Sequence, residues 1–499
     1  MASPVFKTGG AALGVARWVR LPRAPATEEQ LARNSIPRLR PPSVERVLAV
    51  VRGRQGEPVW DADETGALTA IVRATIAEER ALLLEGQAPR TVEQLADGVE
   101  ATLDRYLAPE TAAAPRVINA SGVILHTNLG RAPWPEVAIA ATREASSYAY
   151  LELDPSTGRR TRRFHLAEDH LIALTGADDA LVVNNNAAAV ALAVGLAGPG
   201  GIVIVSRGEL VEIGGGVRIP EIIERAGARL IEVGTTNRTR VADFEGPLVD
   251  RTATVVMRVH PSNFTMAGFI EQPDARALAD LAHAHGAIVI DDLGSGALLE
   301  TERFGLLHEP TPRERLDAGA DVVTFSGDKL VGGPQVGLIV GRADLVARLR
   351  RDPLARAMRP DKAILAAAAA TLGLYRAGVA SQEIPIWQDI AAPAEDLRTR
   401  AEWIASMGAA FFSPHRAIEV VSLRTAVGGG SLPGQTVPSW GVSVRLSSAD
   451  AAAASLRLGE PPILTRIVDD AVVFDLRTVA IGADGDIVRR IGELAAADR

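Results

Sequence analysis

Cysteine is absent from all 499 residues of the chain. The protein therefore cannot form a disulfide, bind zinc through thiolates, or use a cysteine as a nucleophile or persulfide carrier. Any sulfur-like nucleophile in its chemistry must arrive as a substrate. This absence argues against a desulfurase or a selenocysteine lyase that works through a persulfide.

Long hydrophobic runs are also missing. No stretch of about 18 apolar residues is free of charge, so we expect no membrane span. The N-terminal segment is interrupted by Lys7, Arg17, Arg20 and Arg23 and lacks the apolar core of a secretory signal peptide. We therefore expect a cytoplasmic protein.

Charge is unevenly distributed along the chain. The net charge is −8, but residues 1–60 carry ten Lys or Arg against four Asp or Glu, a net of +6, which leaves −14 for the remainder. A basic end on an acidic body fits a nucleic-acid-binding segment, and it fits a solvated arginine-rich leader as well.

Residues 36–115 are predicted to be helical, after a leader of a different kind. Residues 1–35 mix Gly, Pro, Ala and Arg without periodicity, which predicts a disordered leader. Apolar residues at helical spacing follow over 41–53, 64–86 and 91–107. We interpret 36–88 as a helical domain, the candidate nucleic-acid-binding segment, and 89–115 as a helical linker.

From residue 116 the pattern changes to short apolar strands that alternate with helical segments. Such alternation predicts an α/β fold with a mostly parallel sheet covered by helices. We assign 116–360 to this catalytic domain, and 361–499 to a connector helix and a small α+β domain. The strands are expected at 180–184, 201–206, 229–234, 253–260, 287–292 and 321–326.

Polar residues follow several of these strands, where α/β sheets bind their ligands. An enzyme that uses pyridoxal phosphate needs a lysine to form an imine with the cofactor aldehyde and a carboxylate to pair with the pyridinium nitrogen. Lys329, in the sequence FSGDKLVGG, and Asp292, at the end of AIVIDD, suit these roles. Asp291, the preceding residue, is an alternative to Asp292. Only one of the two can face the ring, because neighbouring side chains on a strand point to opposite faces.

The cofactor phosphate needs free N–H groups at a helix N-terminus. Asn185, Asn186 and Ala187 follow a strand and begin a helix of small residues, and Ser326 adds a hydroxyl beside the lysine. We predict these four as phosphate-binding residues. No metal site is predicted.

Several motifs together resemble one enzyme family, the bacterial L-seryl-tRNA(Sec) selenium transferases, also called selenocysteine synthases. The motifs are FSGDKLVGGPQVGLIVG, VNNNAAAV, SRGELVEIGGGVRIPEI, EVGTTNRTR, DLGSGAL, NASGVILHTNLGRAP and GGGSLPGQTVPS. The resemblance implies a fold-type-I pyridoxal phosphate enzyme built as a homodecamer, a pentamer of dimers. It also favours Asp292 over Asp291.

The activity that the resemblance implies is the conversion of L-seryl-tRNA(Sec) to L-selenocysteinyl-tRNA(Sec) with selenophosphate. Elimination of water would give an aminoacrylyl-tRNA intermediate, to which selenium adds.

The resemblance suggests further site residues. Arg131, Arg356 and Arg359 match positions expected to bind selenophosphate, which suits the planar fork of arginine. A solvated helix face is the alternative for Arg356 and Arg359. Within GRRTRR (158–163), Thr161 stands where a glycine is expected.

Related folds place a donor to the cofactor's ring hydroxyl at Ser262 and Asn263. The residue that stacks on the ring is expected near SRGEL, where only Arg207 or Glu209 is available.

Two alternative functions remain. A pyridoxal phosphate lyase or ammonia-lyase of the same superfamily, acting on a small amino acid or amino sugar acid, would keep Lys329 and Asp292 but would not need the basic helical N-terminus. A tRNA-binding scaffold without catalytic activity would need neither residue.

Overall fold

The chain divides into two units, Met1–Pro115 and Arg116–Arg499, in the computed structural model. The structure describes residues 40–55, 66–108, 114–213, 216–250, 253–412 and 418–498. The leader predicted over residues 1–35 lies outside them. Among the described helices, none combines the length and the hydropathy that a membrane span requires.

Three helices form the described part of the N-terminal unit: α2 (Val44–Gln55), α3 (Ala67–Leu84) and α4 (Val92–Leu107). Helix α4 begins at a capping box, in which Thr91 and Gln94 satisfy each other's backbone N–H groups. This helix falls in the segment expected to be a linker, and it packs with the other two around one core. The buried core residues are Val47, Leu48, Val51, Leu68, Val72, Ile76, Leu95, Ala96 and Val99.

A seven-stranded sheet is the centre of the second unit. Its strands pair in parallel except for β11, which is antiparallel to both neighbours. In spatial order they are β3 (Asp179–Val183), β11 (Gly337–Gly341), β10 (Val322–Ser326), β9 (Ile288–Gly294), β8 (Ala253–Val259), β4 (Ile202–Ser206) and β7 (Arg229–Val233).

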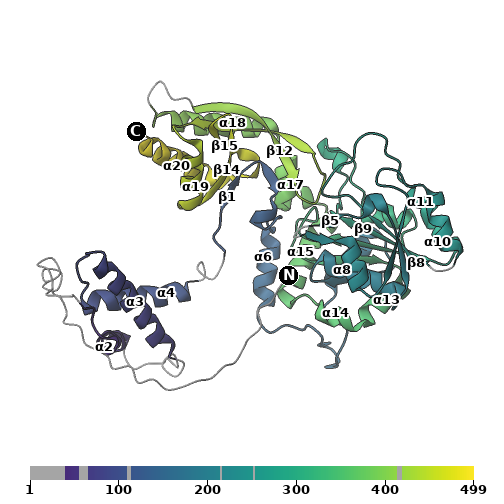
Figure 1. Ribbon diagram of the computed structural model, residues 1–499, viewed down its shortest axis with the longest axis horizontal. Coiled ribbons are helices and arrows are strands. Elements are labelled where there is room, and N and C mark those ends of the chain that lie inside the picture. The colour runs from purple at the N-terminus through teal and green to yellow at the C-terminus, as the bar shows by residue number, and fades with distance from the viewer. Residues whose placement is uncertain are drawn as a thin grey trace, which may run out of the picture. The chain divides into compact units, whose positions relative to one another are not determined.

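Helices cover both faces of this sheet, as the alternating pattern predicts. One face is covered by α8 (Asn186–Val194), α9 (Ile219–Arg225) and α13 (Ala343–Arg351) (Figure 1). The other face is covered by α7 (Leu166–Thr175), α11 (Ala275–Ala284), α12 (Pro312–Asp317) and α15 (Lys362–Arg376). The remaining elements near the sheet are α6 (Glu136–Ala145), α10 (Glu245–Val249), α14 (Pro353–Ala357), α16 (Ala380–Glu383), α17 (Pro385–Ala391) and the short strands β5 (Glu212–Ile213) and β6 (Val217–Arg218).

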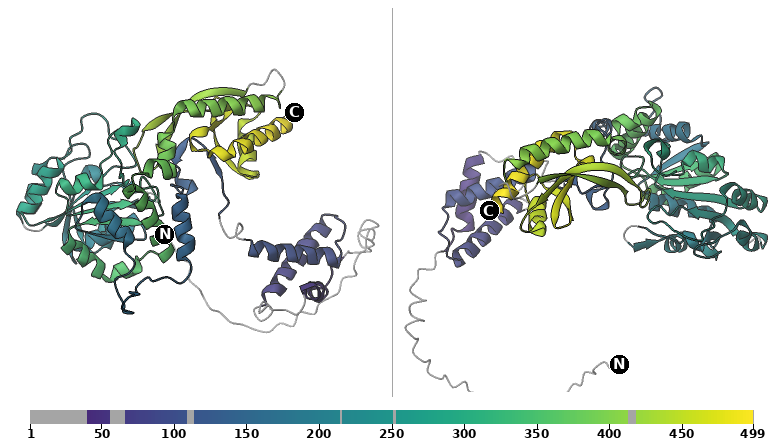
Figure 2. Two further views of the ribbon diagram at one scale, coloured as in Figure 1. Left: turned by 180° about the vertical axis from the view of Figure 1, so that it is seen from behind. Right: turned by 90° about the horizontal axis from the view of Figure 1, so that it is seen from above.

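A second sheet of six strands lies beside the first (Figure 2). Two of its strands come from residues 118–125, which were assigned to the catalytic domain, and pair in parallel with C-terminal strands. Strands of three residues gain backbone partners in this way. The order is β1 (Ile118–Ala120), β14 (Ile463–Val468), β15 (Ala471–Asp475), β13 (Thr436–Arg445), β12 (Ile418–Gly428) and β2 (Val123–Leu125), packed against α18 (Ala394–Ala409), α19 (Ala449–Leu458) and α20 (Asp484–Ala497).

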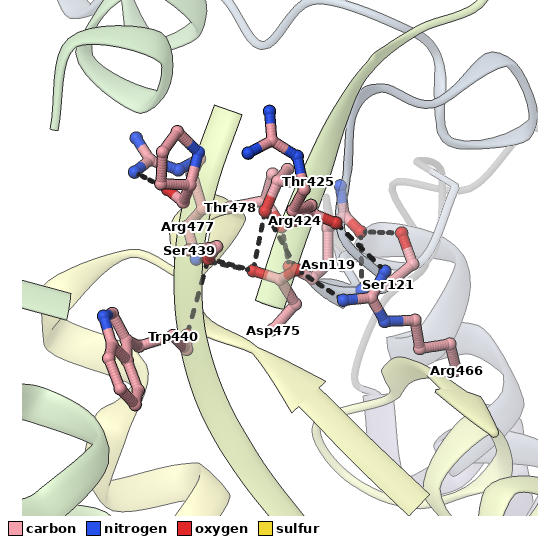
Figure 3. A network of polar contacts seen from close by, with 11 residues as sticks. Asn119, Ser121, Arg424, Thr425, Ser439, Trp440, Arg466, Asp475, Arg477 and Thr478 are labelled. Atoms are coloured by element: carbon pink, nitrogen blue, oxygen red, sulfur yellow. Dashed lines mark hydrogen bonds and ion pairs between the residues drawn. The ribbon is translucent and has the colours of Figure 1, made fainter. Parts of the chain in front are cut away.

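The buried carboxylate of Asp475 joins four strands of this second sheet (Figure 3). It accepts hydrogen bonds from Thr425 Oγ1 of β12 (2.9 Å) and Ser439 Oγ of β13 (2.6 Å). Arg466 of β14 pairs with it at 3.0 Å. A methyl group on Gly122 would lie 2.5 Å from Asp475 Oδ2, so the turn between β1 and β2 requires glycine there. The network therefore fixes the β12–β13 hairpin close to its connecting loop.

We expect Asp475→Ala to destabilise the second unit by about 3 kcal/mol, because Arg466 and two hydroxyls would lose a buried partner. Urea unfolding measures the change. The matched control is Glu419→Ala, an exposed carboxylate on β12, which should change the free energy of unfolding by less than about 0.5 kcal/mol. A loss below about 1 kcal/mol for Asp475→Ala would show that the network is not structurally important.

Candidate active site

The carboxyl ends of four strands of the large sheet meet at one edge. Strand β3 leads to Asn185, β8 leads to Ser262, β9 contains Asp292, and Lys329 follows β10. Parallel strands place their carboxyl ends on the same side of a sheet. The structure therefore brings together the strand-end residues that the sequence analysis selected.

Lys329 lies in a loop that encloses its side chain. The N–H of Leu330 donates to Ser295 O at 3.0 Å, which ties this loop to the end of β9. A methyl group placed on Gly294 would lie 3.7 Å from Lys329 Nζ. One placed on Gly430, from the loop between β12 and β13, would lie 2.7 Å from the same nitrogen. The amine is thus held between the two sheets.

This enclosure changes the chemistry of the amine. Burial lowers the pKa of Lys329, and the positive charge of Arg131 lowers it further, while Asp292 and Asp328 oppose the shift. Arg131 is held at 2.6 Å by Asp328. A lowered pKa leaves more free amine near neutral pH, which a nucleophilic lysine requires.

Asp292 is buried and held by two neighbours. Its Oδ1 accepts hydrogen bonds from Asn186 Nδ2 and Thr324 Oγ1, each at 2.9 Å. Burial raises its pKa, and the two hydrogen bonds act in the opposite direction. A cationic partner such as a pyridinium nitrogen would favour the ionised carboxylate.

Asp291 points to the opposite face of the sheet. Its Oδ2 lies 3.7 Å from Arg258 Nη1 and 3.5 Å from Arg315 Nε. The alternation of side chains along a strand therefore separates the two carboxylates. Asp291 is engaged by arginines, and Asp292 faces the side of α8.

The N-terminus of α8 lies beside Asp292. Asn185 caps this helix by accepting a hydrogen bond from Ala188 N at 2.9 Å, and Ala187 lies in its first turn. Asn186 was predicted to bind phosphate, but its amide group instead donates to Asp292, and its own Oδ1 is buried without a partner. Ser326 is buried at the end of β10. The first turn of α8 keeps the N–H groups and the dipole that bind a phosphate.

Ser262 and Asn263 differ in where they point. A methyl group placed on Gly294 would lie 3.2 Å from Ser262 Oγ as well as near the lysine amine. The Ser262 hydroxyl and the Lys329 amine therefore both face Gly294. Asn263 is exposed, and its Nδ2 donates to Glu212 O of β5 at 2.8 Å. Ser262 therefore lines the site, whereas the amide of Asn263 is used to hold the β5–β6 hairpin.

The three predicted anion-binding arginines are not in contact with one another among the described residues. Arg131 pairs with Asp328 beside the lysine. Arg359 pairs with Glu152 at 3.3 Å. Arg356 is exposed on α14.

A cavity of about 270 Å³ lies next to β3 and contains Arg359. Glu152 bridges Arg359 and Arg163 there, at 3.3 and 3.4 Å. The backbone N–H of Asn184, at the end of β3, donates to Met358 O at 2.9 Å, so the wall of the cavity adjoins the start of α8. The cavity is lined by five arginines: Arg160, Arg162, Arg163, Arg350 and Arg359.

The two residues considered for stacking on the cofactor ring have other partners. Arg207 is exposed and pairs with Glu232 at 3.3 Å. Glu209 is buried and accepts a hydrogen bond from Val259 N at 3.3 Å, and burial raises its pKa to about 7.

Comparison with known proteins identifies the family. The family model described as L-seryl-tRNA selenium transferase matches residues 117–480. The L-seryl-tRNA(Sec) selenium transferase of Moorella thermoacetica is 44% identical over 402 residues, which cover 80% of this chain and 85% of that protein. The chain belongs to the L-seryl-tRNA selenium transferase family.

Two further relatives with the same name are similar over most of their lengths. The protein of Hyphomonas neptunium is 45% identical over 394 residues, 78% of this chain and 83% of that one. The protein of Carboxydothermus hydrogenoformans is 40% identical over 442 residues, 88% and 94% of the two chains. Among solved structures, a D-glucosaminate-6-phosphate ammonia-lyase matches with a TM-score of 0.54 and 22% identity, covering 78% of this chain and 98% of that one. The fold is that of the fold-type-I pyridoxal phosphate enzymes.

The residues of this transferase fit pyridoxal phosphate. Lys329 supplies an amine with a lowered pKa, and Asp292 supplies a buried carboxylate that accepts two hydrogen bonds. The unpartnered Oδ1 of Asn186 leaves one acceptor free beside them. Small residues in the first turn of α8 allow a phosphate to approach the backbone.

The sequence analysis missed one functional position, Gly430. Its backbone has φ of 83°, which favours glycine, and it lies against Lys329 Cε and Nζ. The motif GGGSLPG had been used only for the resemblance. The rarity of lysine also points to Lys329, because Lys7, Lys329 and Lys362 are the three lysines of the chain. Lys362 donates to Ser146 O at 3.3 Å, and Lys7 lies outside the described residues.

We expect Gly430→Ala to weaken the binding of pyridoxal phosphate roughly tenfold or more, because overpacking against the lysine costs about 1–3 kcal/mol. Titration of the visible absorption band measures the affinity. The control is Gly434→Ala, in the same loop, which has a similar φ of 73° but open space around the added methyl group. Equal affinities in the two variants would mean that Gly430 does not shape the site.

Proposed function

We propose that this chain converts L-seryl-tRNA(Sec) to L-selenocysteinyl-tRNA(Sec), with selenophosphate as the selenium donor. The observation that carries the proposal is the family match over residues 117–480, which contain every candidate site residue. The relatives named above carry this activity in their names.

Bound pyridoxal phosphate supplies an electron sink for the carbanion formed at the seryl Cα. Lys329 would hold the cofactor aldehyde and, once displaced by the substrate amine, accept the Cα proton at Nζ. Asp292 would keep the ring nitrogen protonated, because Asn186 and Thr324 already favour its ionised form. Asn185, Asn186, Ala187 and Ser326 form the proposed phosphate site, with Asn186 acting through Asp292.

Arginines would bind the selenium donor. Arg131 is fixed by Asp328, the residue before Lys329, so an anion bound to it would lie close to the amine. Arg359 and Arg356 would also bind the donor, and both belong to the segment beside the arginine-lined cavity. An arriving oxyanion could replace Glu152 as the partner of Arg359, because guanidinium groups bind phosphate oxygens in the same bidentate manner.

The tRNA is proposed to bind the N-terminal unit. Basic and acidic residues are equal in number within its described segments, 40–55 and 66–108. Residues 1–39, outside the described part of the chain, carry six Lys or Arg against two Asp or Glu, a net of +4. Phosphate contacts from this leader, with the helices as a scaffold, fit a protein that recognises RNA by shape and charge.

The working assembly is proposed to be a cytoplasmic homodecamer, a pentamer of dimers. Unit 2 exposes apolar side chains over α6 and the segment after it, which suits an interface between subunits. They are Val137, Ile139, Tyr148, Tyr150 and Leu153.

The two alternative functions have less support. The ammonia-lyase resembles this chain at 22% identity, which supports the fold and not the substrate. A silent scaffold does not explain why Lys329 is enclosed opposite a buried Asp292.

The direct test incubates the purified protein with seryl-tRNA(Sec), with and without selenophosphate. Selenium should appear on the aminoacyl group only when both are present. In Lys329→Ala the rate should fall at least about a hundredfold, because the proton acceptor is lost. Absence of selenium transfer by a protein that carries its cofactor would refute the proposed reaction.

Removal of residues 1–115 should abolish tRNA(Sec) binding and leave the visible cofactor band intact, because the two units have separate cores. A filter-binding assay measures the affinity. Removal of residues 1–39 alone distinguishes the contribution of the basic leader to tRNA(Sec) affinity from that of the helices. Unchanged tRNA binding by the longer truncation would place the tRNA site in the second unit.

A further inference from the structure

A buried carboxyl that the mechanism above does not use lies on another side of Lys329. Glu309 is 3% exposed, although it belongs to a surface loop. Its backbone N–H donates to Thr301 Oγ1 at 3.0 Å, and the same hydroxyl donates to Leu307 O at 2.6 Å. Leu307 N in turn donates to Gln435 Oε1 at 3.3 Å. These contacts fix the loop through its backbone, so they leave the Glu309 side chain free for another purpose.

Three buried polar atoms without hydrogen-bond partners gather at this carboxyl. They are Glu309 Oε1, His260 Nδ1 and Ser295 Oγ. The first two lie 3.9 Å apart, too far for a hydrogen bond. The Ser295 hydroxyl is close enough to lower the pKa of Glu309, but it does not form a well-aligned hydrogen bond. Unsatisfied buried groups are costly, so a cluster of three indicates a site where charge or protons are used.

The same elements hold Lys329. Ser295 O accepts the N–H of Leu330, the residue after the lysine. The N–H of His260 donates to Asp292 O at 2.9 Å. Backbone hydrogen bonds thus connect the end of β9 both to the residue after Lys329 and to His260 at the end of β8.

The charged and titratable groups near Glu309 leave its carboxylate and the Lys329 amine to act on each other's pKa. Burial lowers the pKa of His260 to about 4, with Arg315 adding to the effect, so this imidazole is neutral near pH 7. Arg315 of α12 and Arg258 of β8 both lie within 3.7 Å of Asp291.

Burial raises the pKa of Glu309, and Ser295 together with the positive charges of His308, Lys329 and Arg315 opposes this shift. Glu309 in turn raises the pKa of Lys329, against the burial and the Arg131 charge that lower it. Asp292 and Asp328 are the other carboxylates that act on the amine.

We propose that Glu309 is a positioning residue for Lys329, whose buried carboxylate stabilises the ammonium form of the lysine during the reaction. This role in turnover rests on the proposed function. When the Cα–H bond breaks, its electron pair remains on the substrate and the proton resides on Lys329 Nζ. When the Cβ–O bond breaks, the oxygen leaves with the electron pair of that bond and takes the proton from Nζ, so it departs as water. The pair left on Cα forms the double bond between Cα and Cβ. Glu309 holds the proton on the amine between these two steps and gains or loses no bond itself.

Amine labelling tests the electrostatic part without tRNA or selenophosphate. The full-length chain, freed of its cofactor, is labelled with acetic anhydride over a range of pH, and peptide mass spectrometry compares Lys329 with Lys362 as an internal reference. In Glu309→Gln the free amine fraction of Lys329, and so its labelling relative to Lys362, should rise about threefold or more below the lysine's pKa. The exposed carboxylate of Glu302 supplies the matched control, and Glu302→Gln should leave the ratio unchanged.

An unchanged ratio in folded Glu309→Gln would overturn the proposal. If that variant does not fold, Glu309→Asp keeps the charge but moves it away from the amine, and a smaller rise in the same direction is expected. A ratio equal to that of the wild type would then overturn the proposal. A purely structural role would lower the melting temperature without changing the ratio.

In the holoenzyme, Glu309→Gln should reduce kcat with little change in the KM for seryl-tRNA(Sec), and Glu309→Asp should restore part of the rate. A failure of selenium transfer in the wild type, with the labelling shift present, would refute the proposed function and leave the electrostatic role standing.

Discussion

The free-energy cost of enclosing one amine determines how the catalytic unit is arranged. An ammonium group loses hydration when it is buried, so the Lys329 site must favour the neutral amine or supply negative charge. The structure does both: burial and Arg131 favour the free amine, and Asp292, Asp328 and Glu309 oppose them. Burial outweighs the carboxylates and lowers the pKa of the amine, which favours the free form that attacks a carbonyl carbon and later accepts a proton.

Enclosure also requires a second wall, and the C-terminal sheet provides it. The loop between β12 and β13 places Gly430 against the lysine side chain, and Gln435 of the same loop bonds to Leu307. Close to this loop, the two strands of the hairpin are fixed by Asp475. A change in the Asp475 network can thus reach the site through one hairpin, without touching any residue of the large sheet.

The sequence allowed the prediction of residues whose roles depend on local position. Lys329, Asp292 and Asn185 each lie at the end of an apolar strand, and parallel strands bring such ends together. Roles that depend on long-range packing were not predictable in this way. The bond from Asn186 to Asp292 joins residues 106 positions apart, and the contact of Gly430 with the lysine joins two sheets. Asn263 and Arg359 have side chains that suit the roles predicted for them. In the structure, however, Asn263 binds Glu212 O and Arg359 pairs with Glu152.

The central claim is that Lys329 carries the cofactor within the enclosed site. Borohydride reduction of the holoenzyme fixes pyridoxal phosphate to the amine that holds it, and the chain offers only Lys7, Lys329 and Lys362. Peptide mass spectrometry should find the added pyridoxyl mass on the peptide that contains Lys329 and on neither of the others. The same mass on Lys7 or Lys362, or a holoenzyme that reduction leaves unlabelled, would contradict the account.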